Sequence, residues 1–238
     1  MPPRRRRRRE TLVATRLPLF LEGTRTDLVC YIPPGRHHAD EGRIVGPYDE
    51  WQNEWIDDRD RELCNRIYKE TGFSVYCERY NIRAKRLKNG TYQPNNWIDR
   101  NVYAVARGNH RRFKNKYQRL HLVGYSAGGS VASSQLLAYP NPIVKSMVII
   151  NGKVAVENRK GFRLPHVNAA FDADKIIAKT RPIYGDSDDF RKHADVWREK
   201  NPRVDFKEYK GGHDFFKEGK FGEVLAYVLE WLKSSVRG

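Results

Sequence analysis

Short apolar runs alternate with stretches of helical periodicity along this chain, and that alternation most constrains its fold. Each run is four to eight residues long and is bounded by glycine, proline or charged residues, which is typical of buried strands. Strands that alternate with helices predict a mostly parallel sheet of the α/β class, covered by helices on both faces. The predicted strands lie within residues 11–23, 27–32, 73–80, 119–125, 144–152, 180–186 and 204–212. The predicted helices lie within residues 59–72, 97–106, 127–140 and 221–235. Residues 35–55 are predicted to form a long polar loop.

Positive charge is concentrated in two segments. The 238 residues carry a formal net charge of +16, and a run of arginines stands near the first residue. Mutual repulsion and the lack of apolar side chains should leave residues 1–10 as a disordered tail, and residues 11–238 are predicted to form a single α/β domain. A second basic segment spans residues 79–119. The candidate anion-binding side chains are Arg4, Arg5, Arg6, Arg7, Arg8, Arg9, Arg111 and Arg112.

Two interpretations of these basic segments stay open. Arginine clusters neutralise phosphates, so the tail can serve to bind nucleic acid, an anionic membrane surface or a nuclear import factor. Alternatively, the tail is a solvated terminus and residues 79–119 form a solvated helix face and loop, since no aromatic-rich RNA-binding motif accompanies them.

Several other classes of protein are disfavoured by composition. The chain lacks the run of about eighteen apolar residues that a membrane span needs, and its early apolar segment is too short for a signal peptide. Cys30, Cys64 and Cys77 lack the spacing of a metal or redox motif, so we expect buried free thiols in a reducing compartment. Histidines and carboxylates show no recognisable ligand spacing, and no metal or cofactor is predicted. We expect a cytoplasmic protein or, through its basic terminus, a nuclear one.

A serine surrounded by small residues follows one of the predicted strands. Residues 124–128 read GYSAG, a GxSxG sequence with a predicted strand before it and a predicted helix after it. A nucleophile elbow requires this context, because the turn is so tight that the residues two positions from the serine, Gly124 and Gly128, must lack bulk. Ser126 would then project at the carboxyl edge of the sheet, with a helix N-terminus behind it that favours developing negative charge. The alternative is a glycine-rich turn without chemistry.

The partners that a nucleophilic serine needs occur later in the chain. A serine hydroxyl is a poor nucleophile until a histidine, oriented by a carboxylate, removes its proton. Asp186, Asp188 and Asp189 stand at the end of one predicted strand, and His213 follows the next strand in a glycine-marked loop. The order along the chain is therefore serine, acid, histidine.

With these motifs in this order, residues 11–236 resemble the α/β-hydrolase superfamily of esterases, lipases and related acyl hydrolases. The resemblance matches Ser126 with the nucleophile and His213 with the general base. In that family the acid usually stands three residues after the glycine that ends its strand, which here indicates Asp188. Asp186 is the second candidate, and Asp189 is the third because it can instead cap a helix.

The resemblance also implies an oxyanion hole. One donor is the backbone N–H of the residue after the nucleophile, Ala127, and the other comes from the loop after the strand over residues 27–32. Many relatives carry His-Gly in that loop, whereas this chain has Pro33 and Pro34, and a proline has no N–H to donate. Gly35, or else Arg36, is therefore the candidate for the second donor.

Together these inferences predict a serine hydrolase that cleaves a carboxylic ester or thioester through an acyl-enzyme on Ser126, without a cofactor. The segment before the strand over residues 180–186 is too short for a large lid, which favours little or no cap domain and a small or soluble ester. The second hypothesis is a weak or inactive hydrolase-fold protein that binds nucleic acid or an anionic partner through its basic tail and surface.

Overall fold

The computed structural model describes most of the segments predicted to form the sheet. The described residues are 15–16, 19–34, 48–53, 55–56, 58–77, 80–86, 92–93, 116–126, 128–129, 132, 143–152, 179–200 and 204–236. The strands are β1 Thr15–Arg16, β2 Leu19–Leu21, β3 Asp27–Ile32, β4 Tyr48–Asn53, β5 Trp55–Ile56, β6 Ser74–Cys77, β7 Tyr80–Arg86, β8 Tyr92–Gln93, β9 Arg119–Tyr125, β10 Val144–Ile150, β11 Lys179–Gly185 and β12 Lys207–Tyr209. The helices with assigned bounds are α1 Asp58–Thr71, α4 Lys192–Lys200 and α5 Phe221–Ser234.

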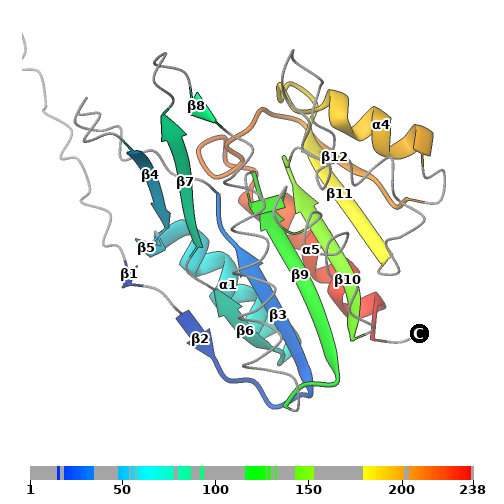
Figure 1. Cartoon of the computed structure of the whole chain (residues 1–238). Coiled ribbons are helices and arrows are strands. Elements are labelled where there is room, and N and C mark those ends of the chain that lie inside the picture. The colour runs from blue at the N-terminus through cyan, green and yellow to red at the C-terminus, as the bar shows by residue number, and fades with distance from the viewer. Residues whose placement is uncertain are drawn as a thin grey trace, which may run out of the picture.

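A seven-stranded sheet forms the centre of the molecule, in the order β12-β11-β10-β9-β3-β6-β2 (Figure 1). Every neighbouring pair is parallel except β2 with β6, which is antiparallel at one edge. All six residues of β3 are buried, as are all but one of β9 and of β10. Central strands of a parallel sheet are buried on both faces and therefore read as continuous apolar runs. The predicted mostly parallel sheet is confirmed.

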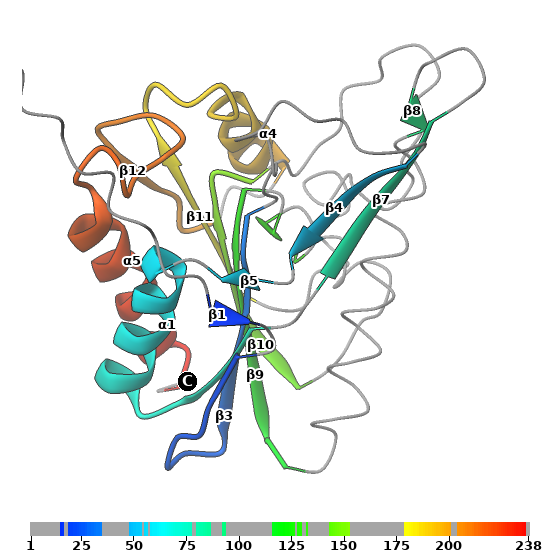
Figure 2. The ribbon, with the colours of Figure 1, turned by 90° about the vertical axis from the view of Figure 1, so that its left-hand side faces the viewer.

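Helices lie on both sides of this sheet. Figure 2 shows α1 and α5 side by side on one side of the central strands and α4 on the other, beside β11. Helix α5 buries one stripe at helical spacing, formed by Val224, Leu225, Val228 and Leu232. Helix α1 ends where Gly72 adopts a φ of 70°, a left-handed conformation that glycine takes without steric cost.

The polar segment between residues 35 and 55 was predicted to be a loop, and this prediction is wrong for its second half. Tyr48–Asn53 forms β4, which pairs antiparallel with β7 in a separate three-stranded sheet. The strand predicted over residues 73–80 contains all of β6, and its last residue, Tyr80, is the first residue of β7. Polar composition suggested a loop, but aromatic residues favour strands, and pairing with a distant partner decides whether such a segment extends.

Cys30, Cys64 and Cys77 are buried free thiols, as predicted. None of the helices in the described ranges has the length and apolar character needed to cross a membrane. The tail over residues 1–10, the helix predicted over residues 97–106 and the segment 153–178, where a cap would be inserted, lie outside the described residues.

Candidate active site

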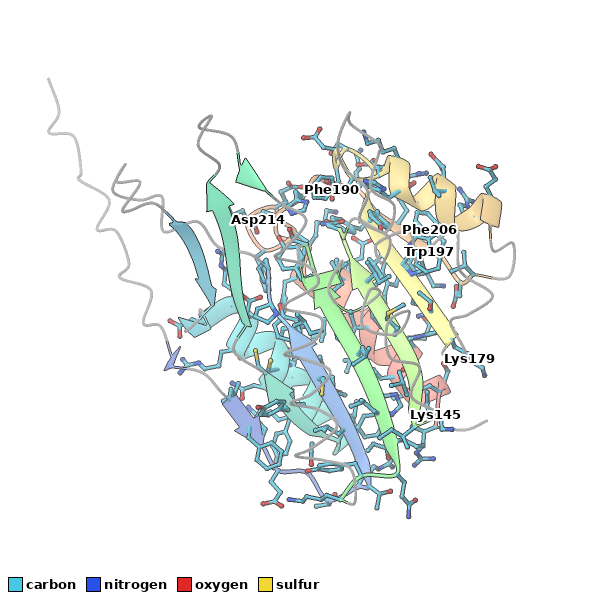
Figure 3. The ribbon with its side chains drawn as sticks, viewed as in Figure 1. Lys145, Lys179, Phe190, Trp197, Phe206 and Asp214 are labelled. Atoms are coloured by element: carbon cyan, nitrogen blue, oxygen red, sulfur yellow. The ribbon has the colours of Figure 1, made fainter. Side chains whose placement is uncertain are left out.

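Three strands deliver the predicted functional side chains to one edge of the sheet. Ser126 follows β9 directly, Asp188 lies three residues after β11, and His213 lies four residues after β12. These strands are parallel, so their carboxyl ends meet at the same edge, where active sites of α/β sheets form. The acid loop is residues 186–191, between β11 and α4, and the histidine loop is residues 210–220, between β12 and α5. Figure 3 shows Phe190 of the acid loop and Asp214 of the histidine loop together at that edge.

Ser126 stands on a strained turn between β9 and the residues that follow. Its φ is 54°, which is uncommon for a residue other than glycine, and its N–H donates to the Ile150 carbonyl at 2.8 Å. A Cβ added at Gly124 would lie 2.4 Å from the Gly128 oxygen, and one added at Gly128 would lie 2.0 Å from the Ile32 oxygen. Any larger side chain at either glycine would therefore clash with backbone, as a nucleophile elbow requires.

His213 bridges Ser126 and Asp188. Its Nε2 lies 2.9 Å from Ser126 Oγ, and its Nδ1 lies 3.0 Å from Oδ2 and 3.1 Å from Oδ1 of Asp188. An ionised carboxylate only accepts hydrogen bonds, so Nδ1 must carry the proton that faces Asp188. Nε2 of the neutral ring is then an acceptor for the Ser126 hydroxyl. The serine proton thus points at a base whose tautomer is set by the acid.

The three candidate carboxylates occupy different environments. Asp188 has a side chain only 1% exposed, and its Oδ1 also accepts the Phe190 N–H at 2.9 Å, which holds the carboxylate toward His213. Asp186 is exposed, and its Oδ1 accepts the Gly211 N–H at 2.9 Å. Asp189 is exposed. Asp188 is the carboxylate in contact with the imidazole, whereas Asp186 ties the acid loop to the histidine loop.

Aromatic rings hold the imidazole on two sides. The Tyr125 ring stacks on His213 at 5.8 Å between centroids, and the Phe190 ring meets it edge to face at 5.1 Å. The His213 side chain nevertheless remains 39% exposed. The two rings therefore restrict the orientation of the imidazole, while part of its side chain stays exposed.

Three charged side chains pair with one another beside the imidazole: Asp214, Arg59 and Lys217. Burial alone would raise the pKa of the Asp214 carboxyl, but hydrogen bonds from the backbone and side chain of Lys217, with the Arg59 charge, hold this pKa below its ordinary value. Arg59 Nη1 lies 3.5 Å and Lys217 Nζ 3.2 Å from Asp214 Oδ2. Asp214 is thus an ionised neighbour of His213 whose charge is matched by two cations.

Two residues that the sequence analysis did not single out contact the histidine loop. Asn151, directly after β10, donates from Nδ2 to the His213 carbonyl at 2.8 Å, and Tyr125 donates from its hydroxyl to the same oxygen at 2.9 Å. The sequence marks both positions. Asn151 and Gly152 form a turn dipeptide at the end of a predicted strand, and Tyr125 is the variable residue before the serine of GxSxG. Neither signal specifies the partner, which comes from a loop more than sixty residues further along the chain.

The other predicted site residues lie outside the described residues. These are Ala127, Gly35, Arg36, Arg4, Arg5, Arg6, Arg7, Arg8, Arg9, Arg111 and Arg112. The backbone before Gly35 is nevertheless close to the elbow, because a Cβ on Gly128 would meet the Pro33 oxygen at 2.6 Å. Among the described residues, no group of three or more His, Cys, Asp or Glu side chains is arranged to hold a metal ion.

Comparison with known proteins bears on the fold of the chain. No protein-family model and no curated protein sequence matches the chain. Solved structures do match it over most of its length. Est1E from Butyrivibrio proteoclasticus with bound ferulic acid has a TM-score of 0.60 at 11% identity, covering 94% of this chain and 97% of its own. A carboxylesterase from Mesorhizobium loti has a TM-score of 0.58 at 16% identity, covering 92% and 98%.

An α/β hydrolase enzyme, MGS-MChE2, from the metagenome of lagoon sediments of Mar Chica, Morocco, has a TM-score of 0.57 at 17% identity, covering 90% of this chain and 94% of its own. At identities this low, the matches show a shared architecture and give no information about the substrate. The sheet order, the turn after β9 and these structural matches agree, and the chain has the α/β-hydrolase fold.

Proposed function

We propose that this protein is a serine carboxylic-ester hydrolase that cleaves an ester or thioester through an acyl-enzyme on Ser126. The observation that carries the proposal is the continuous chain of contacts from Ser126 Oγ through His213 to the buried Asp188 carboxylate. A serine on a strained elbow, in contact with a base that a carboxylate orients, is the arrangement that activates a hydroxyl for acyl transfer.

The first half of the reaction forms the acyl-enzyme. Ser126 Oγ attacks the carbonyl carbon of the substrate while its proton passes to Nε2 of His213, and Asp188 stabilises the imidazolium that results. The tetrahedral intermediate carries a negative oxygen, for which the proposed donors are the backbone N–H groups of Ala127 and Gly35. When the intermediate collapses, the imidazolium gives its proton to the departing alcohol or thiol. The acyl group stays on Ser126.

The second half returns the enzyme to its starting state. A water molecule attacks the acyl carbonyl while His213 Nε2 takes a proton from it, and this proton then passes to Ser126 Oγ as the carboxylic acid leaves. Each proton taken up by His213 is given back, so the step balances without a cofactor. The partial exposure of the His213 side chain is consistent with the approach that the substrate and the water need.

A covalent probe tests this proposal directly. We expect a fluorophosphonate to form one adduct on the wild-type protein, mapped to Ser126 by peptide mass analysis, and Ser126→Ala to lose the adduct. Hydrolysis of p-nitrophenyl acetate should fall by about 10⁴-fold in Ser126→Ala, because the residual rate then comes from binding and oxyanion stabilisation alone.

Ser187→Ala is the matched control, since Ser187 is an exposed serine in the acid loop whose backbone N–H donates to the Gly211 carbonyl at 3.0 Å. This variant should label and turn over at the wild-type rate. No adduct on folded wild-type protein, or an unchanged rate in Ser126→Ala, would refute the proposed function.

A further inference from the structure

Asn151 occupies a position that few residue types can fill. It is fully buried and has a φ of 48°, a left-handed conformation in which glycine, asparagine and aspartate are enriched. Its N–H donates to the Ile183 carbonyl at 2.9 Å, which places it where the ends of β10 and β11 adjoin. The backbone alone would be satisfied by glycine, so the side chain must be explained separately.

The Asn151 amide uses both its donors and its acceptor. Oδ1 accepts the Gly185 N–H at 3.1 Å, at the end of β11. Nδ2 lies 2.5 Å from the Tyr209 hydroxyl and 2.8 Å from the His213 carbonyl oxygen. Since an N–H faces an acceptor in each case, the amide orientation follows from its three partners. The Asn151 side chain thus links β11, β12 and the histidine loop.

The two peptide groups on either side of His213 are both held by this network. The Tyr209 hydroxyl accepts from Asn151 and donates to the Gly212 carbonyl at 2.6 Å. The His213 carbonyl accepts from both Asn151 and Tyr125, which fills its two lone pairs. Burial raises the pKa of the Tyr125 and Tyr209 hydroxyls well above their ordinary value, so both remain protonated donors.

We propose that Asn151 and Tyr125 are positioning residues that clamp the His213 carbonyl and thereby aim the imidazole between Ser126 and Asp188; this inference rests on the proposed function. The direction of a side chain from its Cα is set by the two peptide planes that flank it, and here both planes are anchored. Misplacing a catalytic group by about 1 Å can cost about 100-fold in rate. The clamp acts through His213 and does not touch the substrate.

Two substitutions remove the two donors separately. Tyr125→Phe deletes only the hydroxyl and keeps the ring that stacks on His213. Asn151→Gly deletes the amide and keeps the left-handed backbone, which alanine would strain. Either donor alone can still hold the carbonyl, so each single variant is expected to lose about fivefold in kcat and in the fluorophosphonate labelling rate of Ser126. The double variant is expected to lose about 100-fold, more than the product of the two, with KM for p-nitrophenyl acetate little changed.

Tyr184→Phe is the matched control. Tyr184 is fully buried on β11, and its hydroxyl donates to the Gly152 carbonyl, one residue beyond Asn151. Its loss should lower Tm as Tyr125→Phe does, because each deletes one buried hydroxyl donor, but labelling should stay within about twofold of wild type.

The outcomes separate the two proposals. If wild-type protein labels on Ser126 and folded Tyr125→Phe and Asn151→Gly variants label at the wild-type rate, the clamp is refuted while the proposed function stands. Equal loss of labelling in Tyr184→Phe would also refute it, since general loosening would then explain the effect. If Asn151→Gly does not fold, the rate of Tyr125→Phe decides alone. Wild-type protein that does not label refutes the proposed function, and the clamp falls with it.

Discussion

An aspartate, a histidine and a serine are joined in a chain of polar contacts at each end of the central sheet. At the carboxyl edge they are Asp188, His213 and Ser126. Toward the amino edge, His121 Nε2 lies 3.1 Å from Asp27 Oδ1 and His121 Nδ1 lies 2.8 Å from Ser146 Oγ. Figure 3 shows Lys145, the neighbour of Ser146, and Lys179 at that opposite end.

The surroundings of these two chains differ in ways that matter for chemistry. The His213 side chain is 39% exposed, whereas that of His121 is 0% exposed and stacks on the Phe73 ring at 5.3 Å. Ser126 stands on a strained turn, whereas Ser146 lies within β10. The amino-edge histidine has no open face for a substrate, so its hydrogen bonds serve the packing of the sheet.

The acids differ as well. Arg119 makes a bidentate ion pair with Asp27, with its Nε 2.7 Å and its Nη2 2.9 Å from the two carboxylate oxygens. The Asp188 carboxylate instead accepts a backbone N–H and faces the imidazole. A carboxylate already paired with a guanidinium gains less from a second positive charge. The comparison shows that residue types alone do not make a candidate active site; backbone strain, access and, among the described residues, an acid without a paired guanidinium distinguish the two ends.

Replacing each of the two histidines with alanine in turn tests this comparison with the largest expected effect. His213→Ala should lower the rate of p-nitrophenyl acetate hydrolysis by about 10⁴-fold and change Tm little, because the ring is partly exposed. His121→Ala should leave Ser126 labelling intact and lower the free energy of unfolding by about 3 kcal/mol, a fall in Tm of roughly 6–12 °C. Calorimetry and labelling on both variants check this, and lost labelling in folded His121→Ala would contradict it.

The acid at the amino edge should show itself in the pH dependence of stability. Burial alone would raise the pKa of the Asp27 carboxyl, but hydrogen bonds from His121 and Arg119 and their charges hold this pKa below its ordinary value. A lowered folded-state pKa stabilises the fold above the unfolded value of about 4, and the stabilisation is lost as pH falls through the folded-state pKa.

We therefore expect Asp27→Asn to lower the free energy of unfolding at pH 7 by about 1–2 kcal/mol, with the gap to wild type narrowing below about pH 4. Urea unfolding of both proteins at a series of pH values measures this difference in the free energy of unfolding. Asp214 has a lowered pKa too, but it is present in both proteins and cancels in the difference. A gap that is constant down to pH 3 would count against this role of Asp27.

Substituting Ser126 and Ser146 should give the smallest difference in Tm of these tests, but a large difference in fluorophosphonate labelling. Ser146→Ala removes one buried hydroxyl that contacts His121, so we expect a loss of about 1 kcal/mol, or roughly 2–4 °C in Tm, and no change in labelling. Ser126→Ala should have little effect on Tm while abolishing the adduct. Reduced labelling of Ser146→Ala, measured under the same conditions, would show that the two ends of the sheet are coupled.

The sequence predicts those features that depend on local pattern. Buried parallel strands are continuous apolar runs, so the strands over residues 27–32 and 119–125 were predicted with the bounds that β3 and β9 have. The elbow was readable from Gly124 and Gly128, because a steric requirement leaves a signature in the residues themselves. Strand β4 was not predicted because it forms by pairing with β7, a distant segment, and the polar sequence of residues 48–53 does not indicate that partner.

The site was predictable to the extent that strand ends converge. Three carboxylates follow β11, and the resemblance to α/β-hydrolases ranked them without showing what each one contacts. The distinction is geometric: the Asp186 carboxylate meets the Gly211 N–H, and the Asp188 carboxylate meets His213. The contacts of Asn151 and Tyr125 with His213 were not predictable, since they depend on how a loop from a distant part of the chain closes over the edge.

The register of the parallel strands restricts how chains of this kind can change in length. Tyr125 and Ile150, the last residues of β9 and β10, are paired, and Ser126 and Asn151 directly follow the two strands. Removing or adding one residue within β10 would displace Asn151 by about 3.3 Å and turn every side chain after that point to the other face. Insertions and deletions are therefore expected to accumulate between the strands, and the strands themselves should vary only by substitution.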